Sequence, residues 1–418
     1  MPLGQLSHRY ALTLFAALLL FISSAFAAPA EKIIHTFTNT PDGSTPSARL
    51  IQGAHGNFYG TTLLGGAHNQ GCVFELSRNS DGSWTEKILH SFSGPDGANP
   101  VASLVFDAVG NLYGTTAGGG VYDSGGVAFE LSPSVTGWTE TVLHSFGNGF
   151  DGWDPQAELV FDNAGNLYGT TQLGGAVFGH GDNNGGTVFR LSPGASGWTE
   201  TILYSFTGEY LGPDPNLPAG SVVLDQNGNI YGVAQAGGAN GKGAVYQLTA
   251  AGDGSYTESV IHSFDGTDGE DPDSTLVFDA SGNLYGTTLQ GGHVTPCPSS
   301  GCGVVFKLIN NGDGTWNETV LHAFLGKDGA APIGPLAFDK SGNLYAAAES
   351  GGADSHGTIF NLVPLSNGSW GVHVLHNFTG GSDGASPQAG VTLNSFGIFG
   401  TASAGGSAGS GVAFLIKP

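Results

Sequence analysis

The sequence predicts an all-β fold, a seven-bladed β-propeller of four-stranded antiparallel blades. One motif recurs seven times along the 418 residues, and each copy contains four candidate strands. The two ends of the chain supply complementary parts of the seventh blade. Because a single blade buries little apolar surface, we expect residues 28–418 to form one propeller domain.

The repeated motif is clearest in the segment LHSFSGPDGANPVASLVFDAVGNLYGTT, which begins at Leu89. A histidine, or once a tyrosine, marks the same place in every copy: His35, His90, His144, Tyr204, His262, His322 and His376. The markers are 55, 54, 60, 58, 60 and 54 residues apart. This period, in a sequence rich in strand formers and turns, is typical of propeller blades and is close to the length of Kelch-type repeats.

The second copy illustrates the four strands that we expect in each blade. They should span residues 103–107, 111–116, 126–132 and 138–146. The segment from Asp107 to Asn111 is typical of a hairpin turn, with a side-chain acceptor at its start and Gly110 at its tip.

The chain ends predict how the ring closes. Residues 31–37 match the fourth strand of a copy, whereas the stretch from Ala389 onward supplies only the first three. Pairing of the N-terminal strand with the C-terminal blade therefore completes the seventh blade. A ring closed in this way leaves no terminal blade edge open to aggregation.

Composition excludes several functional classes. The chain has 72 Gly and 20 Pro, and only 11% of its residues are charged. Asp and Glu total 34 against 11 Lys and Arg, which gives a formal net charge of −23. So acidic a surface argues against nucleic acid and anionic membranes as partners. We expect a monomer with no membrane span after removal of the N-terminal segment.

The N-terminus is typical of a secretory signal peptide over residues 1–27. A weakly basic start at His8 and Arg9 precedes an uncharged apolar run, and residues 25–27 (Ala-Phe-Ala) fit a small-x-small cleavage site. We expect cleavage after Ala27 and an exported protein, secreted or periplasmic. The alternative is an uncleaved anchor, but the apolar run is shorter than the roughly 20 residues that a spanning helix needs.

The succession GNLYGTT, GG, GTVFxLSP, VLHSF and DGxxP resembles the GloVer-type extracellular tandem repeat over residues 31–416. The resemblance implies an exported bacterial repeat protein and carries no catalytic residues over to this chain. Many similar proteins end in a C-terminal surface-anchoring segment. This sequence stops at Pro418, directly after its last strand, so we expect release rather than anchoring.

Residues that recur in every copy are expected to serve the fold. The six marker histidines belong to six different outer strands, so we expect them to lie too far apart to bind one metal ion together. The aspartate of each FDxxGN turn should cap that turn, and the recurring Tyr and Trp should pack between blades. We therefore predict no catalytic residue, no metal and no cofactor.

Candidate binding residues lie where the copies differ, in the loops between second and third strands and between blades. These loops share one face of the ring, here called the variable face. Trp153 stands outside the repeat pattern and precedes Asp154, and Tyr210 follows in the next equivalent loop. Aromatic rings beside carboxylates are a common way to hold a sugar; packing of Trp153 within its own loop is the alternative. Glu158 and Glu349 are the acids near this face that an enzyme would use.

Two other groups of polar residues are weaker candidates, in both cases for binding a metal ion. Histidines occur in several second-to-third strand loops, namely His68, His180, His293 and His356, with Asp182 and Asp354 nearby. The loop before the fifth blade holds an acidic run: Asp265, Asp268, Glu270, Asp271 and Asp273. Calcium favours oxygen-rich loops, but this spacing matches no defined motif, so solvated carboxylates are expected.

The three cysteines predict one local disulfide and one free thiol. Cys297 and Cys302 share a long loop of the fifth blade, and an exported protein should oxidise them. Cys72 occupies a strand position and should be a buried thiol.

These observations predict a secreted, non-catalytic binding or interaction protein that uses its variable face, with an extracellular glycan or protein as partner. The alternative is a secreted carbohydrate-active enzyme, either a polysaccharide lyase or a glycoside hydrolase. A glycosidase needs two carboxylates about 5–10 Å apart, and no sequence motif marks such a pair.

Overall fold

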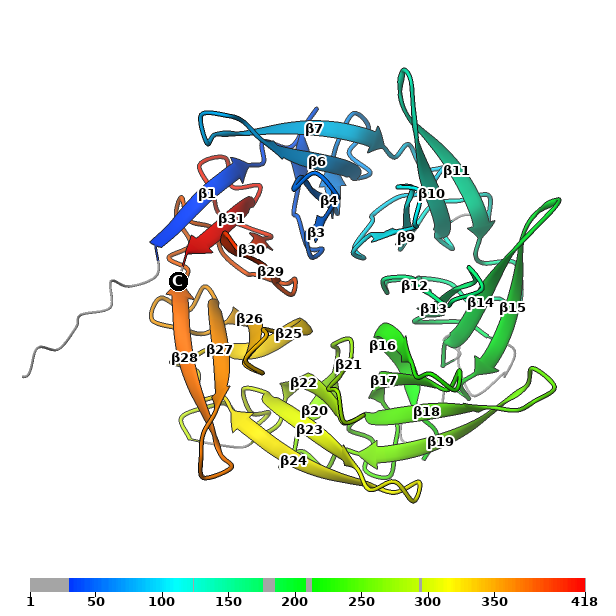
Figure 1. Ribbon diagram of the computed structural model, residues 1–418, viewed down its shortest axis with the longest axis vertical. Helices are drawn as coiled ribbons and strands as arrows, with labels where there is room; N and C mark the ends of the chain where they lie inside the picture. The colour runs from blue at the N-terminus through cyan, green and yellow to red at the C-terminus, as the bar shows by residue number, and fades with distance from the viewer. Residues whose placement is uncertain (1–29, 123, 176–184, 208–212, 293–294, 418) are drawn as a thin grey trace, which may run out of the picture.

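The computed structural model describes residues 30–122, 124–175, 185–207, 213–292 and 295–417. All regular elements in these ranges are strands, and they form seven sheets arranged as blades around a central axis (Figure 1). No helix of the described chain is long and apolar enough to cross a membrane. The predicted seven-bladed propeller is therefore confirmed. The proposed signal peptide, residues 1–27, lies outside the described residues.

Each blade is an antiparallel meander whose first strand faces the axis and whose fourth strand lies outermost (Figure 1). The first three blades are β3 (Ile51–Gln52), β4 (Phe58–Thr62), β6 (Cys72–Arg78) and β7 (Trp84–Ser91); β8 (Val105–Phe106), β9 (Leu112–Thr116), β10 (Val127–Ser134) and β11 (Gly137–Ser145); and β12 (Val160–Phe161), β13 (Leu167–Thr171), β14 (Thr187–Gly194) and β15 (Gly197–Ser205). The next three are β16 (Asn216–Leu224), β17 (Ile230–Ala236), β18 (Ala244–Ala250) and β19 (Tyr256–Ser263); β21 (Val277–Phe278), β22 (Leu284–Gln290), β23 (Val304–Asn310) and β24 (Trp316–Ala323); and β25 (Ala330–Phe338), β26 (Leu344–Ser350), β27 (Thr358–Pro364) and β28 (Trp370–Asn377). Two short extensions add to this plan: β20 (Glu270–Pro272) pairs with β22, and β2 (Gly43–Ser44) pairs with β5 (Leu64–Gly65).

The seventh blade joins the two ends of the chain, as predicted. It consists of β29 (Thr392–Asn394), β30 (Gly397–Ala402), β31 (Val412–Lys417) and the N-terminal β1 (Ala30–Thr36). The register of β1 against β31 runs from Ala30 opposite Lys417 to Thr36 opposite Val412, with one irregularity between Ile33 and His35. Figure 1 shows the blue first strand beside the red last strand.

The innermost strand of the second blade is shorter than predicted, Val105–Phe106 instead of residues 103–107. The chain reaches the axis through a left-handed residue that precedes a proline in every blade, with φ between 51° and 62°: Thr45, Asn99, Asp154, Leu217, Asp271, Ala331 and Ser386. Its amide donates to a carbonyl of the preceding blade; Asn99 N donates to Gln70 O over 2.8 Å. This turn leads the chain from the outer edge of the ring to the axis. In the fourth, fifth and sixth blades the residue before it is already paired in the ladder, as Asn216 is with Ala236.

The core lies between blades and is built from two aromatic positions of the repeat. Phe92 and Phe129 are fully buried, and their rings meet edge to face with centroids 5.1 Å apart. The glycine of YGTT makes room for the second ring, because a Cβ on Gly114 would lie 2.8 Å from Phe129 Cζ. The FDxxGN turn is capped as expected: Asp107 Oδ1 accepts from the amides of Val109, Gly110 and Asn111. The repeated residues thus serve the blades and leave the axis free to vary.

Candidate functional site

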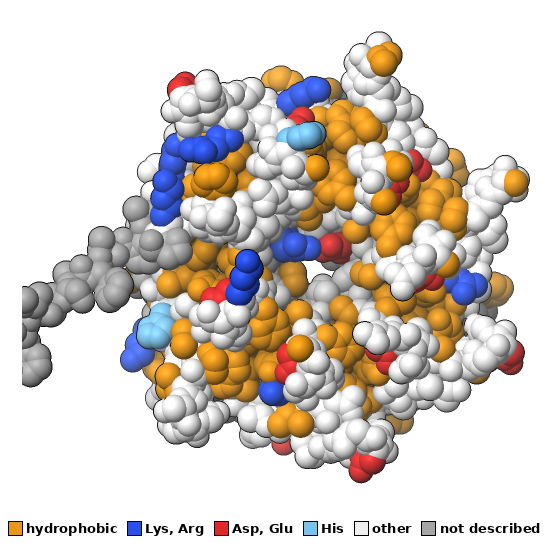
Figure 2. All heavy atoms as spheres, viewed as in Figure 1, with side chains coloured by type: hydrophobic (Ala, Val, Ile, Leu, Met, Phe, Trp, Pro, Cys, Tyr) orange, Lys and Arg blue, Asp and Glu red, His pale blue; other side chains and the backbone are white. Residues whose placement is uncertain are grey.

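A cavity of about 280 Å³ lies on the ring axis, and residues from all seven blades line it. Figure 2 shows the opening at the centre of the ring, with basic and acidic side chains at its edge. The residue directly after each DGxxP-type proline lines this channel: Ser47, Val101, Gln156, Ala219, Asp273, Ile333 and Gln388. The residue two positions further on lines it as well: Arg49, Ser103, Glu158, Ser221, Thr275, Pro335 and Gly390. The frame around these positions recurs from blade to blade, whereas the lining residues differ.

A chain of side-chain hydrogen bonds follows the channel wall in the third and fourth blades. Gln156 Nε2 donates to Asp154 Oδ2 over 2.9 Å and lies 3.2 Å from Gln172 Oε1. Gln172 Nε2 in turn donates to Gln235 Oε1 over 3.1 Å. Carboxamides that bond to one another in this way keep further donor and acceptor capacity for a ligand.

The fifth to seventh blades continue this wall. Asp273 lines the channel, and Gln388 Nε2 donates to Glu349 Oε1 over 2.8 Å. We call the whole set the polar arc: Asp154, Gln156, Gln172, Gln235, Asp273, Glu349 and Gln388. The first two blades present Leu63 and Val101 to the same cavity. The channel therefore presents apolar side chains as well as hydrogen-bonding groups.

An ion pair crosses the channel between the first and third blades. Arg49 Nη2 donates to both carboxylate oxygens of Glu158, over 3.0 and 3.1 Å. The two side chains are 26% and 19% exposed, so the pair is partly shielded from water. A carboxylate held by both oxygens is fixed in position.

Asp273 is the titratable group most altered by the channel. Burial raises its pKa to about 7, and the nearby charges of Asp271 and Glu349 add to this, while a hydrogen bond from Gln235 opposes it. Burial also raises the pKa of Asp154 and of Asp271. Near neutral pH, Asp273 is thus poised to act as a hydrogen-bond donor as well as an acceptor.

Of the five predicted site residues, Glu158 lines the channel, and Asp154 and Glu349 each accept a hydrogen bond from a lining glutamine, Gln156 and Gln388 respectively. Trp153 lies outside the channel. Its backbone pairs with Leu173, its ring lies over Gly174, and the residue is 37% exposed. Tyr210 lies outside the described residues.

Sequence reasoning missed five lining residues, namely Arg49, Gln156, Gln172, Asp273 as a lining residue, and Gln388. It also missed Gln235, which accepts a hydrogen bond from Gln172. A usable signal was present, because these residues vary within segments whose flanks recur in every copy. A polar residue that replaces a small or apolar one at a fixed offset from the DGxxP proline marks the channel.

The acidic run of the fifth blade does not form one cluster. Asp268 lies 3.0 Å from His262 at the outer edge of the ring, and Glu270 forms an ion pair with Lys242. Asp265 accepts from the amide of Thr267 in its own turn, and Asp273 lines the channel. Among the loop histidines, His180 and His293 lie outside the described residues, as does Asp182.

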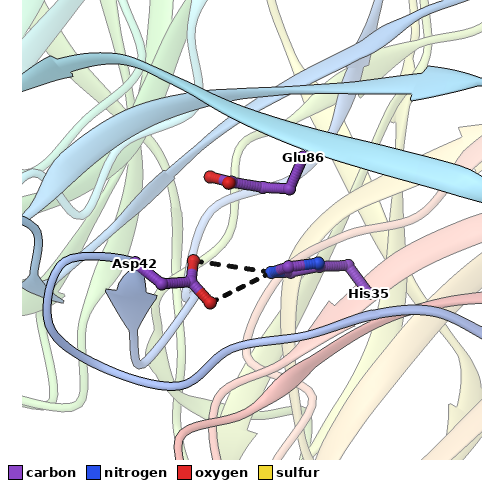
Figure 3. Close-up of side chains that lie close together, drawn as sticks. All are labelled: His35, Asp42 and Glu86. Carbon is purple, nitrogen blue, oxygen red and sulfur yellow. Dashed lines mark hydrogen bonds and ion pairs between the residues drawn. The ribbon is translucent and has the colours of Figure 1, made fainter.

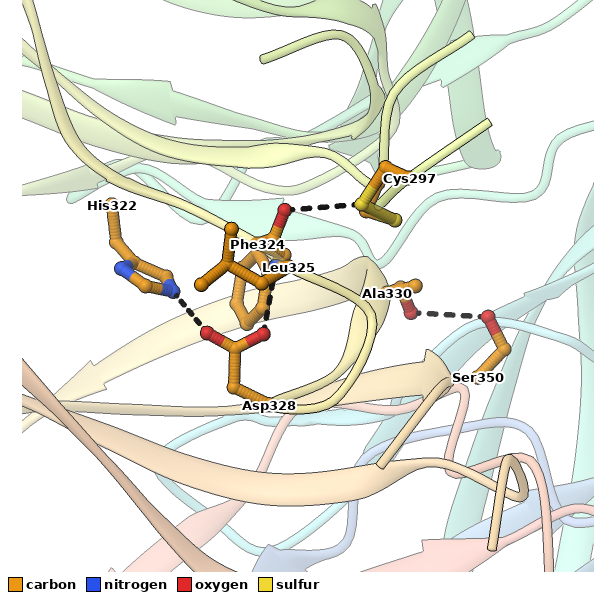
Figure 4. Close-up of a disulfide and its surroundings, with 8 residues drawn as sticks. Cys297, His322, Phe324, Leu325, Asp328, Ala330 and Ser350 are labelled. Atoms are coloured by element: carbon orange, nitrogen blue, oxygen red, sulfur yellow. Dashed lines mark hydrogen bonds and ion pairs between the residues drawn. A yellow bond between two sulfur atoms is a disulfide. The ribbon is translucent and has the colours of Figure 1, made fainter. Parts of the chain in front are cut away.

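The cysteine predictions are confirmed. Cys297 and Cys302 form a disulfide in the loop between β22 and β23, with Cα atoms 5.6 Å apart (Figure 4). The Sγ atom of Cys297 lies 3.3 Å from the carbonyl oxygen of Phe324, so the bridged loop rests on the end of the same blade. Cys72 is a free, buried thiol, and burial raises its pKa to about 12.

The marker histidines lie on six different fourth strands, as expected. Each pairs with the aspartate of the DG turn that follows it in its own repeat, at 2.9 to 3.4 Å. Each histidine ring also packs edge to face on the phenylalanine two residues later in the sequence; the ring centroids of His144 and Phe146 are 4.7 Å apart. At the remaining position Tyr204 donates its hydroxyl to Asp214 over 3.0 Å. These pairs anchor the blade-to-blade loops.

Comparison with solved structures identifies similar folds at low sequence identity. An extracellular domain from B. thetaiotaomicron matches with a TM-score of 0.53 and 11% identity, over 92% of this chain and 40% of that one. This chain thus spans less than half of that relative's length. A protein from Dyadobacter fermentans (TM-score 0.44, 11% identity, 83% and 98% of the two chains) and a luciferin-regenerating enzyme (0.45, 11%, 93% and 95%) resemble it less.

No curated protein matches the chain in sequence. A family model does match, over residues 24–215 and 176–414, and the two matches together span almost all of the propeller. The repeats described above are those of this model, and the chain belongs to the Gloeobacter/Verrucomicrobia repeat family.

Proposed function

We propose that this protein is exported and acts as a binding module that takes a hydroxyl-rich ligand, a glycan, at the axial channel. The observation that carries the proposal is the polar arc. Its carboxamides and carboxylates come from five blades and converge on one cavity, where they bond to one another. A rigid ring holds them in place, so binding requires little ordering of the site.

The chemistry of the arc suits a sugar. Each carboxamide offers donors and an acceptor, and each hydroxyl of a sugar is both a donor and an acceptor. Leu63 and Val101, which also line the cavity, offer an apolar surface for the C–H face of a sugar ring. A cavity with apolar lining residues and a few convergent polar groups is the usual form of a small-molecule site.

The disulfide supports the proposed export. A local Cys297–Cys302 bridge persists in an oxidising compartment and is rare in a reducing cytosol. The apolar segment over residues 1–27, with its small-x-small site, would direct the chain there.

A glycan array with the protein lacking residues 1–27 tests the proposal, followed by calorimetry on any glycan retained. Gln172→Ala and Gln235→Ala should each weaken binding about tenfold, the effect of losing one or two hydrogen bonds. Ala117 occupies the position of Gln172 in the second blade, so alanine fits the fold there.

Gln52→Ala is the matched control. Gln52 is exposed in β3 and contacts Asn394 at the FDxxGN turns, on the face opposite the variable loops. Its removal should leave affinity unchanged. The proposal fails if the array retains no glycan, or if the channel variants bind as tightly as the parent.

A second function, hydrolysis or lyase chemistry on a polysaccharide, is favoured by one observation. Asp273, with a pKa near 7, lies within electrostatic reach of Asp271 and Glu349, and a protonated acid beside ionised ones is the arrangement that acid–base catalysis uses. Glu158 is less suited to this role because Arg49 holds both its oxygens. An activity screen on neutral and acidic polysaccharides should show turnover that Asp273→Asn abolishes; a wild-type protein that binds without turnover rules this candidate out.

A further inference from the structure

A third side chain joins the histidine–aspartate pair at two places where adjacent blades meet. His144 belongs to β11, the outer strand of the second blade. Its Nε2 atom lies 3.1 Å from Asp151 Oδ2 and 3.7 Å from Glu200 Oε2, which belongs to β15 of the third blade. The equivalent group between β1 and β7 is His35, Asp42 and Glu86 (Figure 3). In each group the three candidate ligand atoms lie within 4.8 Å of one another.

The glutamate in both groups has a carboxylate oxygen with no protein partner. Oε1 of Glu86 and Oε1 of Glu200 are buried and accept no hydrogen bond. The same holds for the Oε1 atoms of the equivalent Glu31, Glu140, Glu258 and Glu318. Among the described residues, what sets the two groups apart is the close approach of their three ligand atoms. The Glu200 and Asp151 side chains are only 12% and 9% exposed. A buried carboxylate oxygen without a donor is costly unless a cation or an ordered molecule satisfies it.

We infer that these two groups are binding sites for a divalent transition-metal ion, of which zinc is the representative, and that each bound ion would link two neighbouring blades. Nothing in the glycan proposal depends on these sites, which lie at the outer strands and not on the axis.

The spacing and chemistry of the donors fit such an ion. Zinc bonds to His nitrogen and carboxylate oxygen are about 2.0–2.2 Å long, so ligand atoms around a tetrahedral zinc stand about 3.4 Å apart. The 3.1 and 3.7 Å separations at His144 bracket that value. One imidazole with two carboxylates selects zinc or a similar ion over calcium, which prefers oxygen ligands alone. Two carboxylates and a neutral imidazole also balance the charge of a divalent ion.

The interfaces at His90, His262 and His376 also have an aspartate and a glutamate, but among the described residues only the His35 and His144 groups bring all three ligand atoms within 4.8 Å. Two further interfaces are natural versions of the cluster that lack one ligand. Tyr204 stands in the histidine position beside Asp214 and Glu258, so that interface has no imidazole. At His322 and Asp328, the residue in the glutamate position of the next blade is Val372, so that interface has no second carboxylate. Both interfaces still form blades, which shows that either ligand can be replaced without loss of the fold.

His35→Tyr and His144→Tyr are therefore the variants of choice, because tyrosine already fills this position at 204. The full mature chain, stripped with chelator and loaded with zinc chloride, should retain about two zinc ions after gel filtration, as measured by elemental analysis. Each single variant should retain about one, and the double variant none. Loading with cobalt instead of zinc should give a visible d–d absorption that weakens in each single variant and is absent from the double variant.

Glu200→Gln and Glu258→Gln form the matched pair of controls. Both remove a carboxylate at equivalent positions of adjacent interfaces, but only Glu200 belongs to a proposed site. Glu200→Gln should lose one zinc ion and the zinc-dependent rise in melting temperature at that interface, and Glu258→Gln should lose neither. The inference is overturned if the parent retains no zinc, if the double tyrosine variant still retains zinc, or if Glu258→Gln loses a zinc ion. Circular dichroism confirms that each variant is folded.

Discussion

The outer edge of the ring and the axial channel use the same repeat in opposite ways. At the outer edge, six histidine–aspartate pairs recur with nearly the same geometry and tie each blade-to-blade loop to its strand. In the channel, the positions after the DGxxP proline carry arginine, glutamate, aspartate, glutamine or small apolar residues. One region holds the ring together and the other is free to differ. A repeat protein can thus change its binding surface without changing its core.

The largest expected effect comes from opening the ring. Deletion of residues 28–38 removes β1 with its buried Ile34, removes the buried Phe37 that follows it, and exposes the edge of β31. Loss of the two side chains alone is worth several kcal/mol, so we expect the melting temperature to fall by roughly 10 °C or more. Thermal unfolding followed by circular dichroism measures this. A deletion variant that melts like the parent would show that the first strand is dispensable for closure.

Substitution of two tryptophans, one within the blade packing and one in a blade-to-blade loop, distinguishes residues that hold the ring together from residues that are free to differ. Trp138 packs against the interface of the first and second blades, 6.3 Å from the ring of Tyr59. Trp138→Ala should cost about 2–3 kcal/mol of unfolding free energy and spare ligand affinity. Trp153→Ala should leave stability nearly unchanged, because the residue is 37% exposed, and should also spare glycan affinity, because Trp153 lies outside the channel. Denaturant unfolding and calorimetry on both variants test this contrast, which the reverse pattern would break.

The pH dependence of stability sharpens the account of the outer edge. Burial, with the charge of Asp214, raises the pKa of Glu258 to about 7 from its usual 4.5. The folded state therefore holds this proton more tightly than the unfolded state. The stabilisation is fully present below about pH 4.5 and is lost as pH rises through about 7.

Glu258→Gln should flatten part of this decline. Because the side chain is partly exposed, we expect a change of only about 1 kcal/mol. Melting temperatures of metal-free protein between about pH 4 and pH 8 measure it. A parent protein that gains stability as pH rises across this range would contradict the assignment of a raised pKa to the interface carboxyls.

The smallest effect concerns the cysteines. The Cys297–Cys302 bridge closes a loop of five residues, and short loops contribute little chain entropy to the unfolded state. The double Cys→Ser variant should melt within a few degrees of the parent. Without reductant, peptide mapping should find one alkylated thiol, Cys72, and only after unfolding. Modification of the folded protein at Cys72 would show that this interior position is open to solvent.

Much of the fold was accessible to sequence reasoning because it depends on local patterns. The strand order, the capped FDxxGN turns and the closure of the seventh blade follow from period, alternation and turn chemistry that each copy states independently. The inner strand of the second blade was predicted too long, whereas the inner strands of the fourth and sixth blades span nine residues each and include the left-handed residue before the proline. No propensity rule predicts that conformation for Leu217 or Thr45.

The candidate sites show where sequence reasoning stops. The sequence by itself determined which residues recur and which vary, and so it separated Glu158 and Glu349 from the repeated histidines. Only the tertiary structure decided which side chains from different repeats contact one another. It brought Arg49 to Glu158 across two blades, joined Gln172 to Gln235, and set Glu200 beside the histidine–aspartate pair of its neighbour. The physical reason is that each of these contacts joins different repeats. Its geometry depends on the angle between packed blades, which the aromatic core sets and no single repeat encodes.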